Sequence, residues 1–153
     1  MKLKINFLFL ARIAIGLVLC LSGFIKLTEP YQNFLYDIQQ YSLFSSGVET
    51  FIAQTVPWVE FFVGVFLLLG LWIRVIVPCA FLIFVSFVLI ILQALLKGIS
   101  LDSCGCFGEM IAVPSRVMML FDLVVCVFLF LMIRCYERTS VLSLDRWLSQ
   151  GGE

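Results

Sequence analysis

Residues 56–96 read VPWVEFFVGVFLLLGLWIRVIVPCAFLIFVSFVLIILQALL, an apolar stretch of about 40 residues interrupted only by Glu60, Arg74 and one glutamine. A single helix of that length would measure about 60 Å, twice the thickness of the hydrocarbon core of a bilayer. The stretch therefore predicts two membrane-spanning helices. Arg74, with Gly70 and Pro78 on either side, marks the turn between them.

Two further apolar runs, one near each end of the chain, complete the pattern. With 63% hydrophobic and 13% charged residues, the sequence is too apolar for a soluble domain of 153 residues. We therefore expect an all-α membrane four-helix bundle that forms a single integral membrane domain over residues 1–153. The predicted spans are about 5–25, 56–73, 75–96 and 115–133.

The distribution of Lys and Arg outside these spans predicts the orientation. Six of them fall on one side, namely Lys2, Lys4, Arg74, Arg134, Arg138 and Arg146, against Lys26, Lys97 and Arg116 on the other. Because cytoplasmic segments are enriched in positive charge, both termini are expected in the cytoplasm. The loop 97–114 then faces the outer side, an oxidising compartment.

The segment 28–55, between the first two predicted spans, is expected to be an external loop. Phe34, Leu35, Ile38 and Tyr41 recur there at helical spacing. A short amphipathic helix is therefore predicted on the outer surface, with Thr28 as its N-cap and Pro30 in its first turn.

The external loop 97–114 contains the segment LDSCGCFGE, residues 101–109. A disulfide between Cys104 and Cys106 would close a very small, strained ring and remove little chain entropy, so it would be a poor structural crosslink. Strained, exposed disulfides are easily reduced, which favours a redox-active pair. Gly105 and Gly108 supply the backbone freedom that the bend needs.

Two other interpretations of the thiol pair remain open. The thiols could be inert, or they could form half of a metal site shared with a partner protein. Two thiolates do not complete a tetrahedral site, and the chain contains no histidine. No metal is therefore expected in this chain alone, and mechanisms that need an imidazole are excluded.

Three ionisable residues, Arg12, Glu60 and Asp122, fall within the predicted spans. A charge at the centre of a spanning helix costs about 2.5–3.5 kcal/mol on insertion scales, so these side chains should face the bundle interior and pair. Arg12 can extend toward Asp122, and Glu60 is level with Lys26 and Arg116. They either hold the bundle together as ion pairs or handle protons or substrate beneath the thiol loop.

Three further cysteines, Cys20, Cys79 and Cys126, fall inside apolar runs, where a thiol packs as a small hydrophobic group. Cys20 lies close enough to the outer surface to serve alternatively as a resolving thiol for a mixed disulfide with Cys104 or Cys106.

Several segments together resemble the MauE branch of the DoxX-like membrane protein family, from about residue 8 to 133. They are Ala11-Arg12, Ser22-Gly23-Phe24-Ile25-Lys26-Leu27, Pro57-Trp58-Val59-Glu60 leading to Leu67-Leu68-Leu69-Gly70, and Cys104-Gly105-Cys106-Phe107-Gly108. The resemblance implies four membrane helices and a periplasmic thiol redox role for Cys104 and Cys106. The named family member is needed for methylamine dehydrogenase maturation, where it is thought to form or transport disulfides.

In architecture alone, the chain also resembles quinone-linked disulfide oxidases such as DsbB and vitamin K epoxide reductase. Those proteins carry a C-x-x-C pair and a second external cysteine pair. This chain has Cys104-Gly105-Cys106 and no second external pair.

The resulting functional hypothesis is a membrane thiol-disulfide redox protein that exchanges with an external thioredoxin-like or client protein. A quinone held near Glu60, Arg116 and Phe107 is the candidate electron acceptor. The alternative is a non-enzymatic membrane assembly or maturation factor that docks a partner through its outer loops. The formal net charge of zero gives no indication of nucleic-acid binding. A transporter is disfavoured, because four spans make a pore only as a homo-oligomer.

Overall fold

The described part of the protein consists of α-helices joined by short turns. The computed structural model describes residues 2–40, 46–96 and 115–134, with side chains placed for 8–40, 46–96 and 117–134. The helices of these ranges are α1 (Lys2–Thr28), α2 (Tyr31–Gln40), α3 (Ser46–Leu69), α4 (Ile73–Leu96) and α5 (Ser115–Arg134).

Among these helices, all but α2 contain a segment long and apolar enough to cross a bilayer. The segments are Leu8–Thr28, Ser46–Leu69, Ile73–Leu96 and Val117–Arg134. The prediction of an all-α fold with four membrane-spanning helices is therefore confirmed, and the chain is a multi-pass membrane protein.

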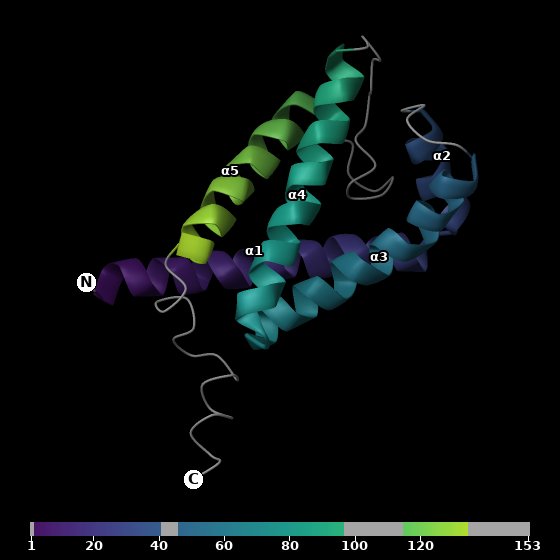
Figure 1. Ribbon diagram of the computed structural model, residues 1–153. Helices are drawn as coiled ribbons and strands as arrows, with labels where there is room; N and C mark the ends of the chain where they lie inside the picture. The colour runs from purple at the N-terminus through teal and green to yellow at the C-terminus, as the bar shows by residue number, and fades with distance from the viewer. Residues whose placement is uncertain (1, 41–45, 97–114, 135–153) are drawn as a thin grey trace.

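The four long helices form two antiparallel pairs. Helix α1 packs along α3, and α4 packs along α5, while the short α2 lies against the first part of α3 (Figure 1). The pairs meet where α4 begins and α5 ends, and they diverge toward the α1–α2–α3 connection and the α4–α5 connection (Figure 1).

Glycines bring the backbones of α1 and α3 into direct contact. A Cβ atom on Gly64 would lie 2.5 Å from the backbone nitrogen of Cys20. A Cβ atom on Gly23 would lie 2.6 Å from the nitrogen of Phe61 and 2.8 Å from the carbonyl oxygen of Pro57. Small residues at such positions let membrane helices approach closely and gain van der Waals contact.

The turn between α3 and α4 lies at Gly70, as predicted, but Arg74 and Pro78 fall inside α4 rather than in the turn. Gly70 has a φ of 69°, and the Leu71 N–H donates to the Phe66 carbonyl at 3.1 Å, so α3 ends in a Schellman motif. Trp72, with a φ of 48°, precedes the first residue of α4. Because the left-handed residues stop the helix, α3 ends at Leu69 rather than near residue 73.

The α1–α2 connection differs from the prediction. Helix α1 continues to Thr28, whose hydroxyl donates to the Ile25 carbonyl at 2.8 Å. The prediction that Thr28 is the N-cap of the following helix is therefore wrong, because its hydroxyl closes the preceding one. The amphipathic helix exists as α2, and the Pro30 carbonyl accepts a hydrogen bond from the Asn33 N–H at 3.0 Å at its start.

Helix α3 also begins earlier than expected, at Ser46 instead of about Val56. Its buried positions Glu49, Ala53, Pro57 and Glu60 continue one face of the same helix across this boundary. The polar residues before Val56 change the hydropathy of the segment, but they do not interrupt the helix.

Each long helix presents a stripe of buried residues spaced three or four apart. On α1 the stripe is Leu8, Arg12, Ile15, Leu19, Ser22 and Lys26, and on α5 it is Met118, Asp122, Val125, Leu129 and Met132. Large apolar side chains cover the outer faces, as expected of a surface that contacts lipid. The ionisable residues of the spans therefore point inward, as the cost of a charge in lipid requires.

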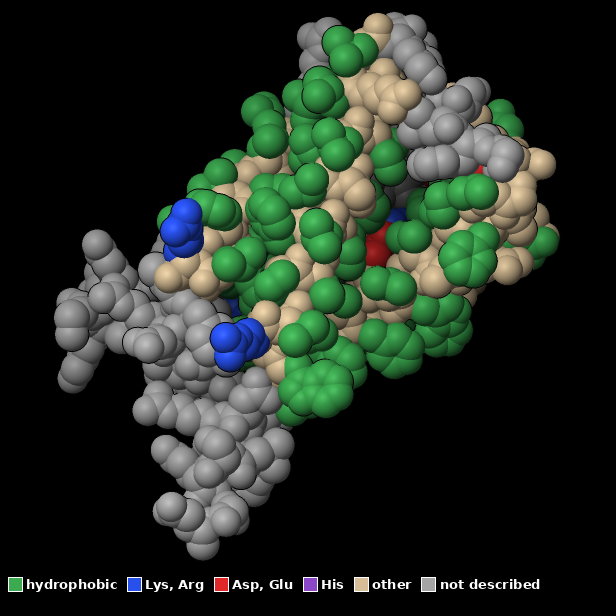
Figure 2. All heavy atoms as spheres, viewed as in Figure 1, with side chains coloured by type: hydrophobic (Ala, Val, Ile, Leu, Met, Phe, Trp, Pro, Cys, Tyr) green, Lys and Arg blue, Asp and Glu red, His purple; other side chains and the backbone are tan. Residues whose placement is uncertain are grey.

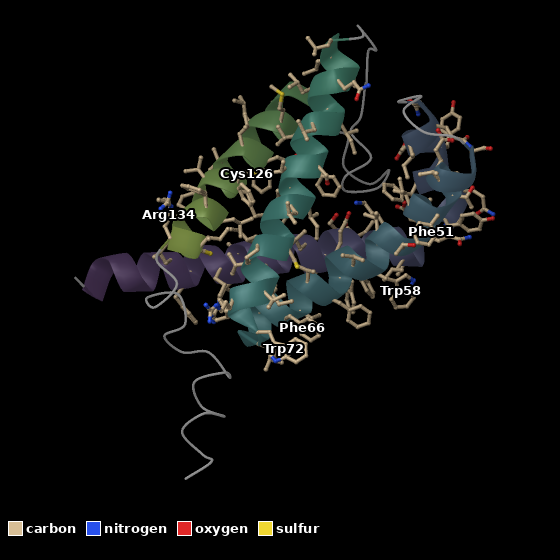
Figure 3. All side chains as sticks on the ribbon, in the orientation of Figure 1. Phe51, Trp58, Phe66, Trp72, Cys126 and Arg134 are labelled. Carbon is tan, nitrogen blue, oxygen red and sulfur yellow. The ribbon has the colours of Figure 1, made fainter. Side chains whose placement is uncertain are left out.

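Helix α3 carries a row of aromatic side chains. Phe51, Trp58 and Phe66 of α3 and Trp72 of the turn that follows it lie one after another along the length of α3 (Figure 3). Phe51, Trp58 and Trp72 are exposed, and Phe66 also packs against the main hydrophobic core. The Phe62 ring stacks on Trp58 and on Phe66, with centroid separations of 6.1 and 6.5 Å.

Candidate functional site

A buried ion pair joins α1 to α3. The Lys26 Nζ lies 2.8 Å from Glu60 Oε1 and 2.9 Å from Oε2, and the Ser22 hydroxyl donates to Oε2 at 3.0 Å. Glu60 is 0% exposed, Lys26 4% and Ser22 5%. Lys26 and Glu60 are thus paired at the same level, and the close approach of α1 to α3 at Gly23 makes the short distances feasible. We call Ser22, Lys26 and Glu60 the buried triad.

Aromatic rings from two other helices enclose the ammonium group of this triad. The Lys26 Nζ lies 4.8 Å from the centroid of the Phe34 ring of α2 and 5.3 Å from that of Phe87 of α4. Both distances fall within the range of cation–π attraction. Figure 2 shows small acidic and basic areas recessed between apolar side chains of neighbouring helices. Side chains of α2, α3 and α4 therefore surround the Lys26 ammonium group of α1.

Three further buried charges, Arg12, Glu49 and Asp122, lie elsewhere on the inward stripes. Arg12 is 1% exposed, and its guanidinium carbon lies 5.0 Å from the centroid of the Phe9 ring. Asp122 of α5 is also 1% exposed. The pairing of Arg12 with Asp122 stays a prediction.

A small cavity lies between α1, α4 and α5. Its volume of about 10 Å³ is close to the minimum that one water molecule needs. The polar residues at its wall are Ser22 and Asp122, and the apolar ones are Val18, Leu19, Phe84, Phe87, Met118 and Phe121. Ser22 therefore belongs both to the buried triad and to this cavity.

The cysteines of the spans occupy packing positions. Cys79 and Cys126 are partly buried against the main hydrophobic core, as predicted, and Figure 3 marks Cys126 on α5. Cys20 is partly buried where α1 crosses Gly64 of α3. Its role as a resolving thiol stays a prediction. Within the described ranges, no three cysteine or carboxylate side chains gather as a metal site would require.

The predicted thiol segment lies outside the described residues. This applies to Cys104, Gly105, Cys106, Phe107 and Gly108. The backbone of Arg116 belongs to α5, but its side chain is also outside what the structure describes.

The fold nevertheless relates the buried triad to this segment. Residues 97–114 connect α4 to α5, and four alternating crossings place that connection on the same side of the membrane as α2. Lys26 lies two residues before the end of α1 on this side. The buried triad is therefore in the half of the bundle that contains the end of α4, where the connection to α5 begins.

Sequence reasoning placed Lys26 and Glu60 together but missed three partners, Ser22, Phe34 and Phe87. One signal was present, because Ser22 and Lys26 are four residues apart and share a helix face. No comparable signal identifies Phe34 or Phe87, since the rotation of α2 and α4 about their axes decides which side chains reach Lys26.

In a comparison with protein families, the chain matches the model described as "Methylamine utilisation protein MauE" over residues 4–135. Curated proteins and solved structures give no significant match. The matched region includes the four spans, the buried triad and the Cys-Gly-Cys segment. Because it covers most of the 153 residues, the chain belongs to the MauE family.

Proposed function

We propose that this protein is a membrane thiol-disulfide redox protein of the bacterial cytoplasmic membrane, with both termini in the cytoplasm. Cys104 and Cys106 are its reactive pair and act on the periplasmic face. The observation that carries the proposal is the spacing of the two thiols, with Gly105 alone between them in the α4–α5 connection. Such a disulfide is strained and easily reduced, as a transferable disulfide must be.

The chemistry is a dithiol–disulfide exchange. A client thiolate attacks one sulfur of the Cys104–Cys106 disulfide, which breaks that bond and forms a mixed disulfide. The second client thiolate then attacks the mixed disulfide, so the client gains a disulfide and the two cysteines become thiols. Two electrons and two protons pass from the client to this chain.

Regeneration requires an acceptor for two electrons and two protons. We propose a membrane quinone, which becomes a hydroquinone as the Cys104–Cys106 disulfide reforms. Glu60, Arg116 and Phe107 are the candidate contacts. The position of Glu60 in the half of the bundle where the α4–α5 connection begins supports this assignment, because that connection carries the two cysteines and the acceptor must approach their sulfurs.

The description of the MauE family suggests the client. It connects the family with methylamine utilisation. We therefore propose that the client is an exported protein of that process whose maturation requires disulfides, either directly or through a thioredoxin-like partner.

Trapping tests this proposal directly. In a Cys104→Ser or Cys106→Ser variant, exchange should stop at the mixed disulfide, so one variant should accumulate a partner adduct that reductant releases. Cys79→Ser is the matched control, because Cys79 packs against the core of the bundle. Absence of an adduct in both single variants, with membrane levels equal to the control, would overturn the redox proposal.

A second candidate is a non-enzymatic assembly factor. The exposed surface of α2 favours it, because none of the ten residues of that helix is buried and its Tyr31 and Tyr36 side chains are exposed. A factor that only docks its partner should keep full function in a Cys104→Ser, Cys106→Ser double variant. Loss of function in that variant would exclude this alternative.

A further inference from the structure

The cavity between α1, α4 and α5 connects two buried polar groups that come from different helices. Ser22 lies at its wall on α1, and Asp122 lies at its wall on α5. Both side chains are almost inaccessible from outside, at 5% and 1% exposed. The other wall residues are apolar, so Ser22 and Asp122 are the two polar residues of the wall among the described residues.

The volume and the polar wall together define the occupant. A cavity of about 10 Å³ has room for one water molecule. An internal water needs two to four hydrogen-bonding partners, and dry cavities are apolar. Ser22 and Asp122 of the wall offer a hydroxyl and a carboxylate, which is the minimum of two partners.

Ser22 extends this site to the ion pair. Its hydroxyl donates to Glu60 Oε2 at 3.0 Å, and Glu60 accepts two further hydrogen bonds from Lys26. A hydroxyl carries one donor and two acceptor lone pairs, so Ser22 can accept from a water while it donates to Glu60. The same water can donate its second hydrogen to Asp122.

We propose that the cavity holds one internal water molecule that links the Ser22 hydroxyl to the Asp122 carboxylate. The buried triad and Asp122 then form one hydrogen-bonded network across α3, α1 and α5. This network contains Lys26, Glu60, Ser22, the water and Asp122, and it extends from the ion pair toward α5. It does not depend on the thiol chemistry.

A structure at a resolution that shows ordered water tests the proposal on the unmodified protein. It should show one compact density peak within hydrogen-bonding distance of both Ser22 Oγ and the Asp122 carboxylate. A cavity without density would overturn the proposal. Elongated density would also overturn it, because a lipid or another organic molecule would then be the occupant.

A double-mutant cycle provides the second measurement. Ser22→Ala and Asp122→Asn each disturb the same water, so their effects on the unfolding equilibrium should couple by about fivefold. Ser86→Ala is the matched control, because the Ser86 hydroxyl donates to Ile83 on the exposed side of α4. It should combine additively with Asp122→Asn. Additive behaviour of the Ser22 pair would contradict the network.

The same cycle in a Cys104→Ser, Cys106→Ser background separates this inference from the proposed function. The coupling should persist there. Loss of coupling only in that background would assign it to the thiols and overturn the water network.

Discussion

Replacing Glu60 with alanine is expected to destabilise the protein by about 3–5 kcal/mol, the cost of removing one partner of a buried ion pair. Glu60 accepts two hydrogen bonds from Lys26 and one from Ser22, and it is 0% exposed. Its removal leaves the Lys26 ammonium, which is 4% exposed, without its carboxylate.

The rings around Lys26 offset only part of this loss. Cation–π contacts contribute about 0.5–2 kcal/mol each, and Phe34 and Phe87 both lie within range. Each hydrogen bond to a charged group contributes about 1.5–3 kcal/mol, and Glu60→Ala removes three. The net loss of stability in Glu60→Ala therefore stays near the range of about 3–5 kcal/mol for a broken buried ion pair. At about 3 kcal/mol it changes the unfolding equilibrium roughly a hundredfold.

Reversible unfolding in mixed micelles, followed by circular dichroism, measures this effect. Gln54→Ala is the control on the same helix, because Gln54 is exposed, and it should change stability by less than about 0.5 kcal/mol. The double variant Lys26→Met, Glu60→Leu removes both charges and should lose less than half as much as Glu60→Ala. The reasoning is refuted if Glu60→Ala matches the control, or if the double variant is less stable than Glu60→Ala.

The remaining predictions concern helix packing, the turn and the orientation. Gly64→Ala should destabilise by about 1–3 kcal/mol, because the new Cβ would lie 2.5 Å from the Cys20 nitrogen and the helices must separate. Gly47→Ala, with nothing within 4 Å, should be neutral or gain up to about 1 kcal/mol in the same unfolding assay. Gly70→Ala should cost about 1–2 kcal/mol, because its φ of 69° is unfavourable for a residue with a Cβ atom, and an unchanged midpoint would contradict this. In a variant without native cysteines, Tyr36→Cys should react with a membrane-impermeant maleimide from the periplasmic side. Labelling from the cytoplasmic side alone would show that the orientation is the opposite of the predicted one.

The number of membrane helices could be predicted because length and hydropathy suffice. The stretch 56–96 is too long for one crossing, and Gly70 supplies the left-handed residue that ends α3. The inward direction of Arg12, Glu60 and Asp122 also follows from the cost of a charge in lipid, and all three are buried.

Helix ends were harder to predict, because hydropathy indicates which residues lie in the membrane and not where a helix begins or ends. Helix α3 begins at Ser46, within a polar segment where backbone hydrogen bonding continues unaffected. Thr28 illustrates a second difficulty. Threonine can either begin a helix or bond to the carbonyl of its own last turn, and only the structure distinguishes the two.

The site was predictable only in part for a related reason. The pairing of Lys26 with Glu60 was predictable, since each charge needs a partner of opposite charge in an apolar environment. The contacts of Phe34 and Phe87 with Lys26 depend on how α2 and α4 rotate and cross, and aromatic residues are common throughout this sequence, with 16 phenylalanines. No sequence pattern distinguishes these two rings from the others.

The central claim is that Cys104 and Cys106 form a redox-active pair, and their redox state in native membranes tests it most directly. The membranes are first treated briefly with a series of increasingly reducing buffers. Alkylation with a mass-shifting maleimide then gives the fraction of Cys104–Cys106 disulfide at each potential. The account predicts a Cys104–Cys106 disulfide that mild dithiols reduce and that added quinone restores. Thiols that stay reduced under oxidising conditions and in the presence of quinone would contradict it.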